Sequence, residues 1–158
     1  MKLSATSIVK LTQCHPDLAN IVKEAASLSP VDFTIGETLR SIERQKQLLA
    51  SGASHTMNSR HLPHKGDGLS YAVDLIALEA GAPSWHWPLY YQLADAMKLA
   101  AFNLKLPLEW GGAFGIRIDQ FIGSAHDASM QYVANQKAKG LSAFLDGPHY
   151  QLPWHEYP

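Results

Sequence analysis

The chain has 158 residues, of which 46% are hydrophobic and 17% are charged, so it suits one folded domain with a single core and shows no bias toward disorder. Its formal net charge of −1 at pH 7 gives no electrostatic reason to expect nucleic acid or an anionic membrane surface as partner. The single cysteine, Cys14, excludes an internal disulfide bond, and no stretch has the roughly 18 apolar residues of a membrane span. Residues 1–7 lack the apolar core of a signal peptide, so we expect a protein made in a cytoplasm. We also expect a monomer with one domain over 1–158.

Helical and strand patterns alternate along the N-terminal third. The second helix has the clearest pattern, because apolar residues recur at helical spacing from Leu18 to Ala25. The strand after it alternates apolar and polar side chains. Ser41 is the expected N-cap of the third helix, and Gly52 is its expected stop. The sequence therefore predicts, in this order, helices over 4–12 and 16–28, a strand over 31–35 and a helix over 42–50.

A long polar loop over 52–68 follows and contains His55, His61 and His64. A loop of this length in a compact domain usually carries function. Residues 113–124 show no clear pattern. The remaining predicted elements are strands over 71–78, 108–110 and 148–152, a turn at 81–83, and helices over 89–104 and 125–139. The first of these two helices has an expected core stripe of Leu89, Leu93, Met97, Ala100 and Leu104. Because the few short strands do not alternate regularly with helices, the pattern favours an α+β fold over a doubly wound sheet.

Two segments combine acids with histidines. Asp74 lies inside an apolar strand, where a carboxylate is costly to bury unless something pairs with it or coordinates it. Downstream, Asp146 and His149 are separated by a Gly-Pro pair. His61, Asp74 and His149 are of the right types for the three protein ligands of a catalytic zinc site, which leaves one position for water. Asp146 would then remain as the general base.

By residue type alone, the alternative is a set of solvated loop histidines, with Asp74 capping a neighbouring turn. Four short motifs in a fixed order favour the metal site: Ser59-Arg60-His61, Ala72-Val73-Asp74-Leu75, Trp110-Gly111-Gly112 and Asp146-Gly147-Pro148-His149. Together they resemble the zinc-dependent D-alanyl-D-alanine carboxypeptidase (VanY-type) family. The segment Leu39-Arg40-Ser41 with Gln45 looks like its phage endolysin branch, the L-alanyl-D-glutamate peptidases. The resemblance covers roughly residues 33–153.

This resemblance implies a Hedgehog/DD-peptidase-like α+β fold, in which a small, mostly antiparallel sheet carries the zinc site and is packed by helices. It also implies that His61, Asp74 and His149 bind Zn²⁺ and that Asp146 is the catalytic acid and base. Arg40 matches an arginine that could hold a substrate carboxylate or polarise its carbonyl, and a guanidinium fork suits either task. The alternative for Arg40 is a solvated arginine at a helix start.

Ser59, Trp110 and Gln151 are the expected substrate-binding residues. Many relatives have glutamate where this chain has Gln151. The predicted strand places Gln151 on the same face as His149, so it is also a candidate hydrogen-bond partner of that ligand.

The spacing of the first two ligands departs from the simplest family pattern, S-x-H-x-x-G-x-A-x-D. His61 and Asp74 are thirteen residues apart rather than seven, so residues 63–68 form an insertion. His64 is therefore an alternative ligand. We favour His61, because Ser59-Arg60-His61 carries the match.

The resemblance implies a zinc-dependent peptidoglycan endopeptidase, an endolysin that cuts the L-alanyl-D-glutamate bond of the bacterial stem peptide. We expect no separate wall-binding domain, no membrane insertion, and residence in the host cytoplasm until release to the cell wall. Two alternatives remain open. One is a D-alanyl-D-alanine carboxypeptidase, and the other is a non-catalytic peptidoglycan-binding module with a structural zinc, for which His64 would be a fourth ligand.

Overall fold

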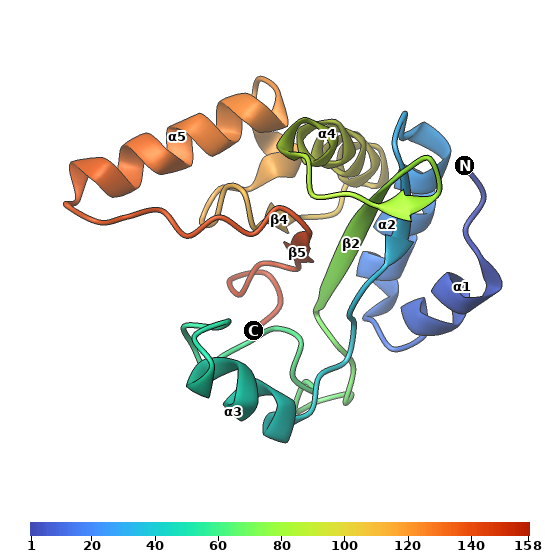
Figure 1. Ribbon diagram of the computed structural model, residues 1–158, viewed down its shortest axis with the longest axis horizontal. Coiled ribbons are helices and arrows are strands. Elements are labelled where there is room, and N and C mark those ends of the chain that lie inside the picture. The colour runs from blue at the N-terminus through green and yellow to red at the C-terminus, as the bar shows by residue number, and fades with distance from the viewer.

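The strand that carries Asp74 runs through the middle of the computed structural model, which describes residues 1–158 (Figure 1). Five strands form one sheet: β1 (Asp32–Ile35), β2 (Ala72–Glu79), β3 (Ala82–Pro83), β4 (Glu109–Trp110) and β5 (His149–Gln151). The helices are α1 (Ala5–Leu11), α2 (Pro16–Leu28), α3 (Ile42–Ala50), α4 (Trp87–Leu104) and α5 (Ala125–Ala138), with a short 3-10 helix, η1 (Ile118–Gln120). None of these helices combines the length and the apolar character that crossing a membrane requires.

The sheet is small and antiparallel, as the family resemblance implies. Its strand order is β1-β2-β5-β4, with β3 paired to the far end of β2. In the β2–β5 register, Asp74 lies opposite His149 and Ala72 lies opposite Gln151. Directly opposite residues of an antiparallel pair have neighbouring side chains on one face of the sheet. The register therefore joins two site residues that are far apart in the sequence.

The main core lies where α2 and α4 meet the sheet. Leu18 and Ile21 of α2, Leu75 of β2 and Leu93 of α4 are all fully buried. Figure 1 shows α4 and α5 above the sheet and α3 apart from them at the lower edge. The space between α3 and the upper helices is where the loops that carry the candidate site meet.

The structure confirms the predicted helices and strands to within two residues at either end. Ser41 caps α3 as predicted, because its hydroxyl accepts a hydrogen bond from the Arg44 backbone N–H. The predicted turn at 81–83 is instead part of a hairpin, since Ala80 and Gly81 have φ of 51° and 80° and let β3 fold back on β2. Residues 113–124, which had no predicted element, contain η1.

The predicted core stripe of α4 is wrong at its C-terminal end. Leu93, Met97 and Ala100 are buried, but Leu104 is 39% exposed. The reason is that α4 packs against α2, β2, α5 and η1, so it buries a broad face rather than one stripe. Small residues fill this broad face and allow close approach, among them Ala94, Ala96 and Ala101.

Candidate metal centre

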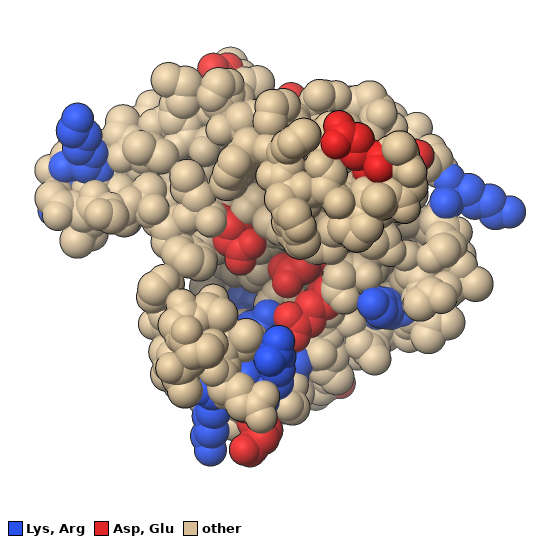
Figure 2. Space-filling view, viewed as in Figure 1, with Lys and Arg blue, Asp and Glu red and all other residues tan.

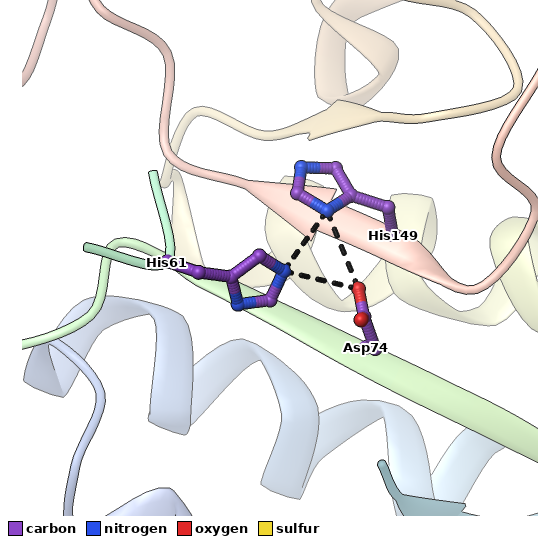
Figure 3. Close-up of side chains that lie close together, drawn as sticks. All are labelled: His61, Asp74 and His149. Atoms are coloured by element: carbon purple, nitrogen blue, oxygen red, sulfur yellow. Dashed lines mark hydrogen bonds and ion pairs between the residues drawn. The ribbon is translucent and has the colours of Figure 1, made fainter. Parts of the chain in front are cut away.

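The three predicted ligands converge from three separate segments (Figure 3). Asp74 comes from β2, His149 from β5, and His61 from the long loop between α3 and β2. The Nε2 atom of His61 lies 3.2 Å from Asp74 Oδ1 and 3.2 Å from His149 Nδ1. His149 Nδ1 lies 3.3 Å from Asp74 Oδ1. The structure therefore brings these residues together as the sequence predicts.

A backbone carbonyl and an amide oxygen fix which nitrogen of each imidazole faces the centre. His61 Nδ1 lies 2.7 Å from the carbonyl oxygen of Thr38, which can only accept, so Nδ1 donates and Nε2 presents a lone pair. His149 Nε2 lies 2.8 Å from Gln151 Oε1 and donates in the same way, which leaves the Nδ1 lone pair toward the centre. Gln151 Nε2 in turn donates to Glu109 at 3.5 Å, in agreement with this orientation of the amide.

The centre is thus a cluster of three acceptor atoms that needs a cation. Burial alone would raise the pKa of Asp74, but the neighbouring His149 and His61 hold it well below its usual range, so the carboxylate stays ionised. Four tetrahedral ligands at zinc bond lengths of about 2.0–2.1 Å are about 3.3–3.4 Å apart, close to the separations here. Two imidazoles and one carboxylate are also a donor set that zinc accepts. The residues fit a zinc ion.

The same cluster attracts protons. Burial lowers the pKa of His149, but the hydrogen bond and negative charge of Asp74 more than offset this and raise it above its ordinary value. A cation that binds between the three side chains therefore competes with a proton, and its binding is expected to weaken as the pH falls.

Asp146 lies beside the cluster without belonging to it. The turn from Asp146 to His149 closes with a hydrogen bond from the His149 N–H to the Asp146 carbonyl at 3.2 Å. Gly111, directly after β4, holds this turn in place with two backbone hydrogen bonds. Its carbonyl accepts from the Asp146 N–H at 2.9 Å, and its N–H donates to the His149 carbonyl at 2.7 Å. Burial raises the pKa of the Asp146 carboxyl, and the charge of Asp74 adds to this, although His149 opposes it.

These residues line a cleft of about 470 Å³. Figure 2 shows it as a hollow near the middle of this face, with acidic and basic side chains in its walls. One wall comes from the loop after α3 and the other from the segment after α5. The rings of His55 and Phe144 meet edge to face across it, with 4.9 Å between their centroids. This contact therefore bridges the two walls of the cleft.

Arg40 lies in the cleft wall as an ordered cation rather than a solvated helix-start arginine. Its Nε and Nη2 atoms donate to the two carboxylate oxygens of Glu37 at 2.9 and 2.6 Å. Its Nη1 atom donates to Gln45 at 2.7 Å and lies 3.5 Å from the Ser59 hydroxyl. This fork holds the guanidinium in one orientation.

The remaining predicted residues differ in where they lie. Ser59 lines the cleft, and its hydroxyl accepts from the His61 backbone N–H at 3.2 Å. Gln151 also lines the cleft. Trp110 does not, because it is fully buried and its indole N–H donates to the Gly147 carbonyl at 2.7 Å. It supports the turn of residues 146–149 from behind.

His64, the alternative ligand, lies outside the cluster. Its Nε2 atom is 2.8 Å from the Pro158 carbonyl oxygen, and its ring stacks on Tyr71 with 4.2 Å between centroids. Sequence reasoning missed Thr38, which orients His61 through a backbone carbonyl. A backbone contact leaves no mark on the residue type, so no pattern in the sequence could have revealed it.

Comparisons with known proteins identify the family to which the chain is similar. A model of the family "Phage L-alanyl-D-glutamate peptidase" matches residues 1–152. The L-alanyl-D-glutamate peptidase of Escherichia phage T5 is 26% identical over 119 residues, which are 71% of this chain and 83% of that protein. The crystal structure of the L-Ala D-Glu endopeptidase ChiX of Serratia marcescens is 32% identical and covers 100% of this chain and 94% of its own, with a TM-score of 0.73. The family match spans all three ligand positions and Asp146.

Proposed function

The chain belongs to the phage L-alanyl-D-glutamate peptidase family, and from this premise we propose that it hydrolyses the L-alanyl-D-glutamate bond in the stem peptide of bacterial peptidoglycan with zinc as cofactor. Membership makes it a peptidase and hence a hydrolase. The observation that carries the proposal is the meeting of three acceptor atoms beside a half-buried carboxylate that is not one of them. All four residues come from one chain, so we propose that a monomer is active.

His61, Asp74 and His149 would hold the zinc ion. When bound, the ion acidifies a water molecule and polarises the carbonyl of the scissile bond. The chain supports this role with two outer hydrogen bonds, from His61 to the Thr38 carbonyl and from His149 to Gln151, which keep the lone pairs aimed at the centre.

Asp146 would move the proton. As a carboxylate it accepts a proton from the attacking water, and as the acid it then gives this proton to the nitrogen of the leaving amine. Burial raises its pKa toward the working pH, which suits a group that must both take and release a proton. Arg40, held in place by Glu37, would orient an oxygen of the substrate in the same cleft.

A closed structural zinc site fits the geometry less well. Structural sites have four protein ligands, whereas here three ligand side chains converge and His64 is engaged elsewhere. A site with three protein ligands and an adjoining cleft keeps a position for water and substrate. This supports the enzyme over the non-catalytic binding module.

The decisive experiment combines zinc content with the release of amino groups from purified peptidoglycan. For the wild type we expect about one zinc per chain and a steady release of amino groups. His61→Ala should lose both. His155→Ala is the matched control, because that side chain is 96% exposed and lies in the C-terminal tail. Zinc without any release would refute the peptidase, and full activity in His61→Ala would refute the ligand assignment.

The identity of the new chain ends separates the endopeptidase from a carboxypeptidase. We expect mass spectrometry to find glutamate as the new N-terminal residue and no free alanine. Release of single D-alanine residues would instead support the carboxypeptidase. As an endolysin, the protein would reach this substrate at the host cell wall after release from the host cytoplasm.

A further inference from the structure

A second pocket, of about 440 Å³, adjoins the catalytic cleft, and the insertion between the first two ligands forms one of its walls. Residues 62–65 line the pocket together with Trp154. The pocket and the cleft share Ser59 and Arg60, so the two are neighbours. The insertion that separates His61 from Asp74 therefore forms part of a pocket that has no role in the proposed mechanism.

Arg60 brings a buried positive charge to this boundary. The residue is only 4% exposed. Its Nε donates to the Leu152 carbonyl at 3.0 Å, and its Nη2 donates to the carbonyls of Pro153, at 3.2 Å, and Tyr157. All its partners are backbone carbonyls, which satisfy hydrogens but do not neutralise a charge. A buried cation is normally paired with an anion.

The third guanidinium nitrogen is open. Trp154 covers one region of the guanidinium, with the ring centroid 3.9 Å from Cζ, and the Tyr71 ring centroid lies 4.9 Å away. Nη1 of Arg60 makes no hydrogen bond. Among side-chain N and O atoms that are sealed from solvent, only the Tyr150 hydroxyl lacks a hydrogen-bond partner, so Nη1 is not one of the sealed atoms. Nη1 of Arg60 must therefore reach solvent, by way of the pocket or the cleft that the residue lines.

The two cavities differ in the acidic side chains that line them. The pocket is lined by Arg60, Lys65 and His64 and by no Asp or Glu side chain, and the main-chain oxygen of Pro158 in its wall is already bound to His64. Lys65 is exposed and has no ion-pair partner. Asp67 does not line the pocket; it accepts from the Tyr71 hydroxyl at 2.7 Å and lies 3.8 Å from His64 Nδ1. A free carboxylate is attracted to such a pocket. The catalytic cleft, in contrast, is lined by three acids, Glu37, Asp74 and Asp146, as well as by Arg40.

We propose that this pocket is a carboxylate subsite, in which Arg60 Nη1 and Lys65 bind the free carboxylate of the glutamate residue that follows the scissile bond. The inference rests on the proposed function. A glutamyl residue has two carboxyl groups and uses only one to continue the chain, so its other carboxylate is free. The guanidinium of Arg60, at the boundary of the cleft, would pair with this free carboxylate, whereas Asp74 and Asp146 in the cleft would repel it.

The test compares two synthetic stem peptides that differ only in this group, one with the carboxylate and one with the carboxamide. We expect the wild type to have a KM roughly tenfold lower for the carboxylate, in line with a hydrogen bond to a charged group, and a similar kcat for both. Lys65→Glu should remove or reverse the preference. Lys23→Glu, on the exposed face of α2, makes the same charge change far from the pocket and should keep it.

Arg60→Gln is the second variant, and it is interpreted only if circular dichroism shows a folded protein, because Arg60 also ties down the C-terminal tail. Equal KM values for the two peptides in the wild type would overturn the subsite, and so would an unchanged preference in Lys65→Glu. If neither peptide is cleaved, the proposed function fails instead. Calorimetric binding of both peptides to Asp146→Asn then decides the subsite by the same preference for the carboxylate.

Discussion

Gly111 shows how closely a single residue can control this site. A Cβ atom at this position would lie 2.2 Å from the Asp146 carbonyl oxygen and 3.0 Å from the Cβ of His149. Both contacts are with atoms of the turn over residues 146–149, which cannot move aside without moving the proposed base, Asp146, and a proposed ligand, His149. We therefore expect Gly111→Ala to lower kcat by about a hundredfold or more, since displacements near 1 Å can have this effect.

Gly140→Ala is the control for that prediction. Gly140 has a φ of 72° at the end of α5, and nothing lies within 4 Å of its added Cβ. Backbone strain of about 1–2 kcal/mol should lower its stability while kcat stays unchanged. Thermal unfolding and peptidoglycan turnover of both variants separate the two effects, and a fully active Gly111→Ala would show that the turn can shift without loss.

Asp146→Asn tests the proposed base directly. The amide has the same shape but cannot take a proton from water, so we expect kcat to fall by about 10²–10⁴ while the zinc content stays unchanged. In the wild type, kcat should fall as the pH drops through the raised pKa of Asp146, because the base is then protonated. A pH–rate profile and zinc analysis check both points. Substantial activity in Asp146→Asn would assign the base elsewhere.

The same substitution should stabilise the metal-free protein. A carboxyl whose pKa is raised on folding favours the folded state at pH values below its unfolded pKa, and this contribution is lost as the pH rises through the folded pKa. Where Asp146 is ionised in the folded state, its partial burial therefore lowers the free energy of unfolding, and asparagine removes this cost. Thermal unfolding in the presence of a chelator should show a higher Tm for Asp146→Asn than for the wild type at pH 7 and a smaller difference at pH 4. A lower Tm at pH 7 would contradict the prediction.

At the scale of one element, α3 matters because of what it holds in the cleft. Gln45 is fully buried although it is polar, and its amide oxygen accepts from Arg40 at 2.7 Å. Its amide nitrogen donates to the Thr56 carbonyl at 2.5 Å and to the Ser54 hydroxyl at 2.9 Å. One side chain therefore fixes both the cleft arginine and the loop that follows the helix.

We expect Gln45→Ala to release this loop. Lost hydrogen bonds to buried groups cost about 1–3 kcal/mol, and the freed Arg40 should raise KM more than it lowers kcat. Limited proteolysis should cut within 52–58 faster than in the wild type. Gln47→Ala, on the exposed side of the same helix, makes an equal change in residue type and should leave both readouts as they are. Equal cleavage in the two variants would contradict the prediction.

Elements were predictable from the sequence where their pattern is local. Ser41 marks the start of α3, and the spacing from Leu18 onward marks the buried face of α2. The stripe of α4 was wrong at Leu104, because the exposure of a helix end depends on which partners reach it, and those partners are distant in sequence. The hairpin at Ala80 was missed because a non-glycine residue with positive φ is uncommon.

In the candidate site, too, the residue types could be predicted from the sequence, whereas the backbone contacts could not. The residue types and motif order pointed to His61, Asp74 and His149, and the structure brings them together. Which histidine nitrogen faces the centre could not be predicted, because the Thr38 carbonyl and the turn near Gly111 act through the backbone. Backbone contacts of this kind depend on the folded path of the chain rather than on the side chains.

At the scale of the whole molecule, the candidate metal centre joins the loop after α3, the central strand β2 and the C-terminal strand β5. These segments meet only in the folded chain, so a cation that binds them has little affinity for the unfolded state and stabilises the fold. Free zinc at about 100 times its Kd should add about 2.7 kcal/mol, which corresponds to a rise in Tm of about 5–10 °C for a chain of this size.

This rise in Tm tests the centre without any substrate. We expect the wild type to unfold at a lower temperature after treatment with a chelator, and added zinc should restore the Tm. Asp146→Asn should show the same zinc-dependent rise, because its side chain lies outside the cluster, whereas His61→Ala should show little or none. A zinc-dependent rise that persists in His61→Ala would place the ion elsewhere. No rise in the wild type would mean that the three acceptor atoms hold a proton rather than a metal, as the raised pKa of His149 allows.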